Sequence, residues 1–236
     1  IALAPDILHF EFGALAVGQT YLKEALHCAL GVSFRGYDLN YAGLENPDHY
    51  ARLWSAVDAV HVLGLALWQT AVARGCPADK PHALIPPAID IELFAGQKST
   101  GKAGNGSDAR PLRILSVGRL EWVKGYEYAL GAVRELAHRG VAFEYRIIGD
   151  GTYLEPLAFA RYEMGLESDV HFLGRQAQPA VIEQMKWADV FLQASVSEGF
   201  CNAVVEAQAM SLPVVATDAG GLPENVADGC TGFVVP

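Results

Sequence analysis

The stretch Glu198-Gly199-Phe200-Cys201-Asn202-Ala203-Val204-Val205-Glu206 decides the fold class that we predict for this chain. An apolar run, Val190–Leu192, precedes it, and a second one, Val214–Thr217, follows it. Strand, turn, helix and strand in this order place Glu198 at the carboxyl end of a parallel strand and Glu206 on the next helix. Two carboxylates at two depths of one cleft suit a ligand rich in hydroxyl groups, such as a sugar joined to a nucleoside.

The same alternation extends over the second half of the chain. Between the strand-like runs lie helical patterns, and the runs themselves are Arg113–Val117, Phe143–Ile148, Val170–Leu173, Val190–Leu192, Pro213–Thr217 and Phe233–Val235. Six strands that alternate with helices predict an α/β fold with a parallel sheet covered on both faces. We therefore predict a nearly complete Rossmann-like domain over residues 112–236 that lacks its C-terminal tail.

Residues 1–94 show the same alternation in incomplete form. Four strands are predicted, at Ile7–Phe10, Val32–Phe34, Ala59–Leu63 and His82–Ile85, with a helix over Leu15–Leu30. This is the second half of another Rossmann-like domain. Residues 95–111, rich in Gly, Ser, Lys and Asn, predict a flexible interdomain segment. The start without Met and the strand-like run before Pro236 suggest a fragment, which we expect to be poorly active by itself.

Composition limits the function classes. The chain has 236 residues, is 51% hydrophobic and carries a net charge of −10, so we expect no nucleic-acid partner. The absence of a Cys-x-x-Cys pair predicts reduced thiols and a cytoplasmic protein. No Asp-x-Asp sequence and no paired histidine spacing occur, so we expect no metal. No apolar run approaches the roughly 18 residues that span a bilayer.

Several motifs resemble those of a known family in their order and spacing. They are Ser116–Leu120 followed by Lys124-Gly125, Ile148–Gly151, Val170–Gly174, Ser197–Phe200 continuing to Glu206, Thr217–Glu224 and Gly232–Val235. Together they resemble the retaining glycosyltransferases called group 1 or family 4, whose architecture of two Rossmann-like domains is named GT-B. The resemblance implies an acceptor-side domain over 1–94 and a nucleotide-sugar-binding domain over 112–236.

The resemblance also implies the activity and the catalytic residues. A sugar would pass, with retention, from a nucleotide-diphosphate sugar to an acceptor hydroxyl, with no resident cofactor. Arg119 and Lys124 would stabilise the charge on the departing nucleoside diphosphate, so that no metal is required. Glu198 would hold the donor sugar, and Glu206 would accept from the ribose hydroxyls. The structural alternatives are two solvated cations at a loop, and carboxylates that complement a helix dipole.

Further donor contacts follow from the same resemblance. Leu173, Gly174 and Arg175 would flank the base, mainly through their backbone. The remaining donor-binding residues are Gly118, Gly149, Asp150, Gly151, the Gly199, Phe200, Cys201 and Asn202 turn, and Arg35. Arg35 lies in Ser33–Asp38, which resembles the family's His-Gly-x-Asp loop, and it keeps donor capacity but is no neutral base. Gly149–Gly151 is not a dinucleotide fingerprint, because Leu154 occupies the place of the third glycine.

Two other functions stay open at this point. A phosphorylase on the same scaffold would place orthophosphate beside Arg119 and Lys124, and a non-catalytic protein would only bind a nucleotide sugar. The motifs resemble most those of bacterial enzymes of exopolysaccharide or cell-envelope glycan synthesis. That resemblance implies a hexosyltransferase with a glycan or lipid-linked glycan acceptor, at the inner face of the plasma membrane. The sequence contains no recognisable basic amphipathic helix of the kind that indicates membrane association.

Overall fold

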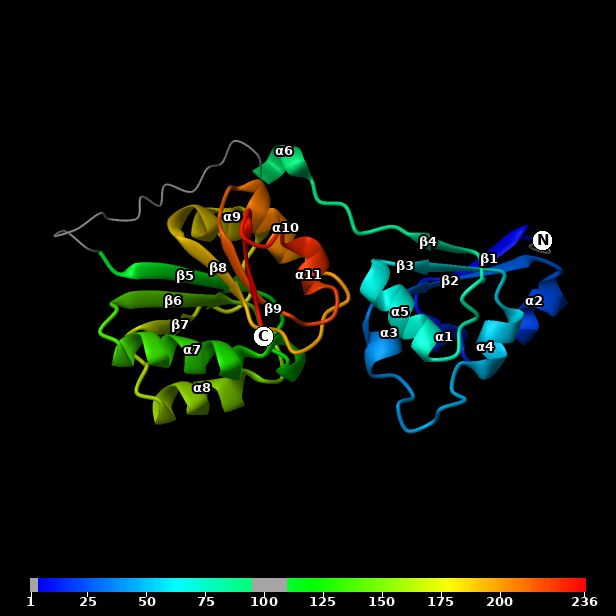
Figure 1. Cartoon of the computed structure of the whole chain (residues 1–236), viewed down its shortest axis with the longest axis horizontal. Helices are drawn as coiled ribbons and strands as arrows, with labels where there is room; N and C mark the ends of the chain where they lie inside the picture. The colour runs from blue at the N-terminus through cyan, green and yellow to red at the C-terminus, as the bar shows by residue number, and fades with distance from the viewer. Residues whose placement is uncertain (1–3, 95–109) are drawn as a thin grey trace. The chain divides into compact units, whose positions relative to one another are not determined.

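The structure, a computed structural model, describes residues 4–94 and 110–236. The chain forms two compact units, Ile1–Pro87 with Glu198–Phe200, and Ala88–Ser197 with Cys201–Pro236 (Figure 1). The division after Pro87 differs from the sequence-based boundary at 94, because helix α6 (Ile91–Phe94) buries Phe94 in the core of the second unit. Residues 95–109 of the predicted interdomain segment lie outside the described residues.

The first unit is built on a four-stranded parallel sheet in the order β1-β2-β3-β4. The strands are β1 (Ile7–Phe10), β2 (Ala29–Phe34), β3 (Ala59–Val62) and β4 (His82–Leu84). The helices are α1 (Gly13–Ala16), α2 (Tyr21–Leu26), α3 (Tyr37–Asn40), α4 (Ala51–Ala56) and α5 (Leu65–Ala73). The core is aromatic: the Phe34 ring centroid lies 5.5 Å from that of Tyr50 and 5.0 Å from that of Trp54.

One predicted helix of the first unit is wrong. Residues 15–30 do not form a single helix but the end of α1, a turn, α2 and the start of β2. Gly18 (φ +82°) and His27 (φ +51°) adopt left-handed backbone that interrupts a right-handed helix. The Ala29 N–H then donates to the Asp6 carbonyl (2.9 Å), which starts the pairing of β2 with β1. Sheet pairing therefore overrides the apolar periodicity of this segment.

The second unit contains a six-stranded sheet in the order β10-β9-β8-β5-β6-β7, with every pair parallel. The strands are β5 (Leu112–Val117), β6 (Phe143–Ile148), β7 (Val170–Phe172), β8 (Val190–Gln193), β9 (Val214–Thr217) and β10 (Gly232–Val235). This confirms the six predicted strands. Strand order reverses between β5 and β8, and ligands of doubly wound sheets bind outside the carboxyl ends of the strands at such a switch point.

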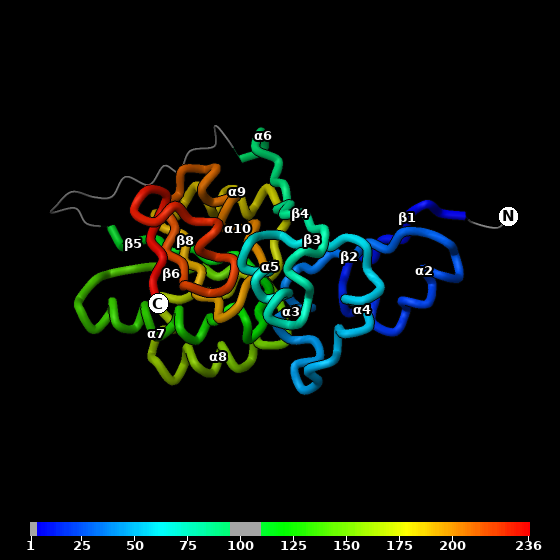
Figure 2. The backbone as a smooth tube through the Cα atoms, turned by 45° about the vertical axis from the view of Figure 1, so that its right-hand side comes forward, coloured from blue at the N-terminus to red at the C-terminus, as the bar shows by residue number. Residues whose placement is uncertain are grey.

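Helices cover both faces of this sheet (Figure 1). They are α7 (Tyr126–His138), α8 (Leu154–Glu163), α9 (Gln178–Trp187), α10 (Asn202–Ala209) and α11 (Leu222–Asn225), with a 3-10 turn η1 (Trp122–Lys124) before α7. Alternation along β5 sends Ile114 into the core under α7 and α8, and Leu115 into the core under α9 and α10. Figures 1 and 2 both show α7 and α8 side by side. Within the described ranges, no helix is long and apolar enough to cross a membrane.

Candidate functional site

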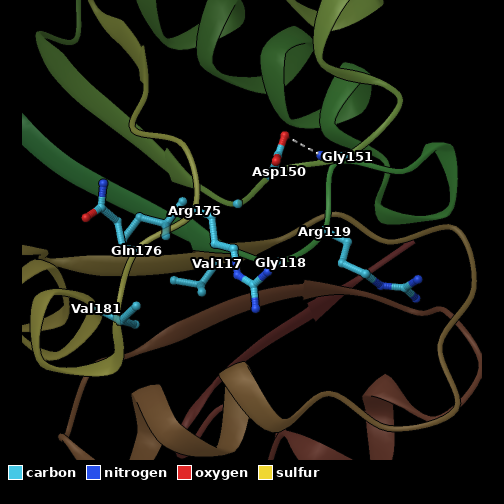
Figure 3. Close-up of a pocket in the computed structure, with 10 residues that line it drawn as sticks. Val117, Gly118, Arg119, Asp150, Gly151, Arg175, Gln176 and Val181 are labelled. Carbon is cyan, nitrogen blue, oxygen red and sulfur yellow. Dashed lines mark hydrogen bonds between the residues drawn. The ribbon is translucent and has the colours of Figure 1, made fainter.

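A pocket of about 500 Å³ lies at the carboxyl ends of β5, β6 and β7 in the second unit (Figure 3). Its lining residues are Val117, Gly118, Arg119, Ile148, Gly149, Asp150, Gly151, Arg175, Gln176 and Val181. Six of them, Gly118, Arg119, Gly149, Asp150, Gly151 and Arg175, are among the predicted site residues. The pocket therefore gathers three separate motifs at the edge of the sheet where the topology predicts a ligand.

Backbone hydrogen bonds join the three loops that form this rim. The Gly118 N–H donates to the Ile148 carbonyl and the Leu120 N–H donates to the Asp150 carbonyl, both at 2.9 Å. The Gly149 N–H donates to the Gly174 carbonyl at 3.0 Å. These bonds continue the pairing of β5, β6 and β7 beyond the ends of the strands, so the pocket wall is a continuation of the sheet.

The glycines at this rim permit close backbone contact. A Cβ atom on Gly149 (φ +153°) would lie 1.8 Å from the Gly118 carbonyl oxygen. A Cβ atom on Gly151 would lie 2.2 Å from the Leu120 carbonyl oxygen. Any side chain at either position would push the β5 and β6 loops apart. The Gly149 and Gly151 motif is thus explained by packing of backbone on backbone, which also leaves the pocket open.

Three cations surround Gly118. Arg119 and Arg175 are exposed and line the pocket, and Figure 3 shows the Arg175 side chain over Val117 and Gly118, whereas the Arg119 side chain extends away from them. Within the described ranges, neither guanidinium forms an ion pair. The Lys124 Cδ and Cε atoms come within 4.0 Å of where a Cβ on Gly118 would lie. The two guanidinium groups without an ion pair, those of Arg119 and Arg175, suit an anionic ligand.

Part of this pocket was not predicted from the sequence. Arg175 was predicted to act mainly through its backbone, whereas its side chain projects into the pocket. Gln176 was not expected there at all; its Nε2 donates to the Leu173 carbonyl at 2.6 Å. Val117 and Ile148 are the last residues of β5 and β6, and their position at the ends of predicted strands could have identified them as pocket residues. No pattern indicated Val181, which α9 brings in.

Glu206 carries the other notable charge of the second unit. It is half-buried on α10, and no described residue donates a hydrogen bond to its carboxylate. Burial raises the pKa of the Glu206 carboxyl above its ordinary value. A half-buried carboxylate without a donor carries a desolvation cost that a hydroxyl-bearing ligand would offset.

The remaining predicted site residues do not line the pocket. They are Lys124, Leu173, Gly174, Glu198, Gly199, Phe200, Cys201, Asn202, Glu206 and Arg35. Glu198, on the loop between β8 and α10, is only 8% exposed. Arg35, in the first unit, donates through Nε to the Glu11 carbonyl (3.3 Å) and pairs with the Glu11 carboxylate.

The expectation for Cys201 requires correction. Cys201 was predicted to bind the donor, but its N–H group donates to the Asn225 side-chain oxygen at 3.0 Å. The Cys201 side chain is 5% exposed and packs in the core with Val204 and Leu222. These contacts describe Cys201 as a small structural residue, at which the start of α10 is anchored to α11.

Metal ligands are not clustered in the part of the chain that the structure describes. No group of three or more His, Cys, Asp or Glu side chains converges there in a way that could hold an ion. The Asp150 carboxylate, the acidic group of the pocket, accepts the Gly151 N–H at 2.8 Å (Figure 3). Asp150 therefore stabilises the loop after β6 through this hydrogen bond.

Comparison with known proteins identifies the family. The family model described as "Glycosyl transferases group 1" matches residues 97–236, more than half of the chain. The chain belongs to the group 1 glycosyl transferases. The matched range contains the whole pocket, so the rim formed by Gly118, Gly149 and Gly151 is part of the family domain.

Individual relatives extend the match to the first unit. The amylovoran biosynthesis glycosyltransferase AmsK of Erwinia amylovora is 32% identical over 98% of this chain and 57% of its own length. The putative colanic acid biosynthesis glycosyltransferase WcaL of Escherichia coli K12 is 31% identical over 98% of this chain and 58% of its own length. The chain thus spans somewhat more than half the length of these curated relatives.

Solved structures support the fold. The crystal structure of Anabaena HepE in complex with UDP matches with a TM-score of 0.80 at 22% identity, over 98% of this chain and 65% of that one. The apo form of the lipopolysaccharide outer core galactosyltransferase WaaB matches with a TM-score of 0.75 at 19% identity, over 98% of this chain and 62% of that one. The two parallel sheets and this likeness confirm the predicted α/β fold of the GT-B class.

Proposed function

We propose that this chain is the larger part of a retaining glycosyltransferase that uses a nucleotide-diphosphate sugar as donor and a hydroxyl group of a glycan as acceptor. The observation that carries the proposal is the pocket at the ends of β5 to β7, which Arg119 and Arg175 line and in which neither forms an ion pair among the described residues. The second unit is then the donor-binding domain and the first the acceptor-side domain.

The cations supply the chemistry of the leaving group. When the bond between the sugar and the diphosphate breaks, negative charge grows on the departing phosphate oxygen. We assign Arg119 and Lys124 the stabilisation of that charge through charge-assisted hydrogen bonds; Arg119 lines the pocket and the Lys124 side chain lies next to Gly118. Because two side-chain cations can perform this role, we propose that transfer requires no metal ion.

The carboxylates supply recognition of the donor. Glu206 is half-buried and accepts no hydrogen bond from a described residue, so ribose hydroxyl groups are the partners that we assign to it. Glu198 would hold the hydroxyls of the donor sugar and stabilise positive character at the anomeric carbon. We propose retention without a covalent intermediate, with the leaving phosphate taking the proton of the acceptor hydroxyl on the same face.

The biological setting follows from the relatives. AmsK and WcaL are named for the biosynthesis of amylovoran and of colanic acid. We propose that this protein acts in bacterial exopolysaccharide or cell-envelope glycan synthesis, as a hexosyltransferase. Its place would be the cytoplasm, at the inner face of the plasma membrane, where a lipid-linked glycan acceptor is available.

Calorimetry tests the proposal. The full chain is titrated with UDP-, GDP- and ADP-glucose, with NAD and with inorganic phosphate, each with and without EDTA. We expect one nucleotide sugar to bind at least tenfold tighter than NAD, unchanged by EDTA. Sugar release that depends on phosphate and not on nucleotide would indicate a phosphorylase instead. Equal affinity for NAD and all three nucleotide sugars would contradict a dedicated donor site.

A further inference from the structure

A second pocket, of about 280 Å³, lies on the second unit outside the proposed nucleotide site. Its lining residues are Trp122, Gly125, Tyr126, Glu127, Tyr128, Tyr153 and Val196. Four of these seven carry aromatic rings, one carries a carboxylate, and none is Lys or Arg. We call this set the aromatic pocket. Its chemistry differs from that of the cationic nucleotide pocket and is not used by the proposed transfer reaction.

Backbone geometry builds this pocket. Gly125 (φ +62°) joins η1 to α7, and a Cβ atom there would lie 1.9 Å from the Ala194 carbonyl oxygen and 3.3 Å from Tyr128 Cδ2. The Val196 N–H donates to the Val123 carbonyl at 2.9 Å, which ties the loop after β8 to η1. Only glycine allows this approach, so the floor of the aromatic pocket is a fixed feature of the fold.

The exposed rings do not serve the core of the second unit. Trp122 is 55% exposed and Tyr128 is 67% exposed. On α7 the core-facing side is provided by Tyr126, Ala129, Leu130 and Val133, which are buried. Two large aromatic side chains therefore remain in water around a hollow. Such a concentration of exposed aromatic surface is typical of a binding site.

A polar acceptor lies among the rings. The Tyr153 hydroxyl donates to Glu127 Oε1 at 3.2 Å, and this hydrogen bond with the Glu127 charge raises the pKa of Tyr153. The phenol thus stays protonated and holds the carboxylate in place. No described residue donates to the second oxygen, Glu127 Oε2. That oxygen can accept a hydrogen bond from a ligand hydroxyl.

We propose that the aromatic pocket binds a neutral sugar residue of the acceptor glycan, with Trp122 and Tyr128 against the apolar face of the ring and Glu127 accepting from a hydroxyl. A sugar ring combines an apolar face of C–H groups with hydroxyl donors at its edge, which matches rings beside a carboxylate. An anionic ligand finds no cation in the lining.

An organic cation is the competing occupant, because aromatic rings with a carboxylate also attract ammonium groups. A cage for such a cation needs several ring faces around one point. Here Tyr126 is only 5% exposed and its hydroxyl donates to the Gly118 carbonyl at 3.1 Å. One of the four rings of the aromatic pocket is therefore buried instead of facing the hollow, which favours the flat face of a sugar over an ammonium cage.

The aromatic pocket adjoins the nucleotide pocket. Gly118 lines the nucleotide pocket, and its carbonyl accepts the hydroxyl of Tyr126, which lines the aromatic pocket. Trp122 and Lys124 belong to the same turn, η1. A sugar held at Trp122 would thus keep its chain close to the donor. The identification of the sugar as part of the acceptor rests on the proposed function, but binding of a neutral sugar does not.

Saturation-transfer NMR tests the inference on the full chain. The probes are cellobiose and lactose, with tetramethylammonium as the ammonium probe, and UDP binding is measured on the same samples. We expect both disaccharides to receive saturation in the wild type, and Trp122→Ala and Tyr128→Ala to lower that transfer at least tenfold. Trp122→Phe should restore most of it. Tyr162→Ala, an equally exposed aromatic (66%) on α8, is the matched control and should change nothing.

The outcomes separate the two proposals. Transfer to neither disaccharide, or equal transfer in the wild type and in both alanine variants, would overturn the inference. A response to tetramethylammonium alone would make the site an ammonium cage and would also overturn it. A wild-type protein that binds the disaccharides through Trp122 but binds no nucleotide would instead remove the proposed donor function. Thermal melting of each variant checks that a loss of signal is not a loss of folding.

Discussion

Gly149 lies so close to Gly118 that a Cβ atom on Gly149 would come within 1.8 Å of the Gly118 carbonyl oxygen. The β6 loop and the β5 loop are therefore in direct backbone contact at the pocket rim. At the same place, the Gly118 N–H donates a hydrogen bond to the Ile148 carbonyl at 2.9 Å. The shape of the nucleotide pocket depends on this pair of residues.

Gly149→Ala should destabilise the protein and open the rim. Because the obstructing atom is backbone, the loops must separate, and we expect a loss of about 2–4 kcal/mol in the free energy of unfolding. Gly131→Ala is the matched control, since nothing lies within 4 Å of a Cβ atom in the middle of α7. It should stabilise by about 0.5–1 kcal/mol. Urea unfolding of both variants measures the difference, and equal stabilities would contradict the contact.

Arg119→Ala should weaken donor binding without loss of folding. Removal of a cation that makes charge-assisted hydrogen bonds to a diphosphate costs about 1.5–3 kcal/mol, or roughly ten- to hundredfold in affinity. Arg119→Lys should recover part of it, because lysine keeps the charge but not the fork of donors. Calorimetry with the preferred nucleotide diphosphate measures the effect. Arg134→Ala, on the exposed side of α7, is the control, and an equal loss there would indicate a nonspecific charge effect.

Glu206→Gln should stabilise the protein while weakening donor binding. Burial raises the pKa of the Glu206 carboxyl, so the folded protein holds a proton that the unfolded chain releases, and stability falls as pH rises above the ordinary glutamate pKa. Glutamine removes the buried charge. The melting temperature of the variant should exceed that of the wild type at pH 7, and the difference should shrink as pH falls toward the ordinary glutamate pKa of about 4.3 and be absent below it.

The same substitution tests the role of Glu206 in recognition. An amide accepts fewer hydrogen bonds than a carboxylate, so we expect nucleotide affinity about tenfold weaker in Glu206→Gln. A variant that gains stability at neutral pH and keeps wild-type affinity would show that Glu206 is desolvated but does not touch the nucleotide. Opposite signs for stability and binding are the result that supports the proposed site.

Asp189→Asn should destabilise the second unit at neutral pH. The Asp189 carboxylate accepts two hydrogen bonds from Arg110, each 2.6 Å, and one from the Arg113 N–H at 3.0 Å. Burial raises the pKa of Asp189, but these donors outweigh it and leave the pKa below its ordinary value. The stabilisation is therefore present above the ordinary aspartate pKa and is lost as pH falls through the folded pKa.

Melting temperatures between pH 3 and pH 7 measure this effect. The deficit of Asp189→Asn should be largest at neutral pH and should vanish in acid, where the wild-type carboxyl is protonated. Glu183→Gln is the control, because its partner Lys186 lies at 2.7 Å on the surface and the Glu183 side chain is 66% exposed. Exposed pairs contribute little, so we expect less than about 0.5 kcal/mol there. A pH-independent deficit at Asp189 would point to packing instead.

Local apolar patterns predicted the strands of the second unit correctly, but they predicted a wrong helix in the first unit. The six strands of the second unit are short apolar runs between loop signals, and each formed where it was predicted. Residues 15–30 have helical periodicity yet contain the start of β2, because pairing of Ala29 with Ile7 depends on a partner distant in the sequence. The ion pair between Arg35 and Glu11 likewise could not be predicted, because pairing of β1 with β2 brings the two residues together.

By itself, the sequence determined the α/β class, the six parallel strands of the second unit and the motifs whose glycines and cations meet at the pocket, because these depend on periodicity and on residue type. Only the tertiary structure decided that the Arg175 side chain enters the pocket, that the Cys201 N–H is used by Asn225, and that Trp122 and Tyr128 share a hollow. Those features depend on side-chain direction and on contacts between distant segments. The local sequence does not determine side-chain direction or these distant contacts, because both form only when the loops pack against one another.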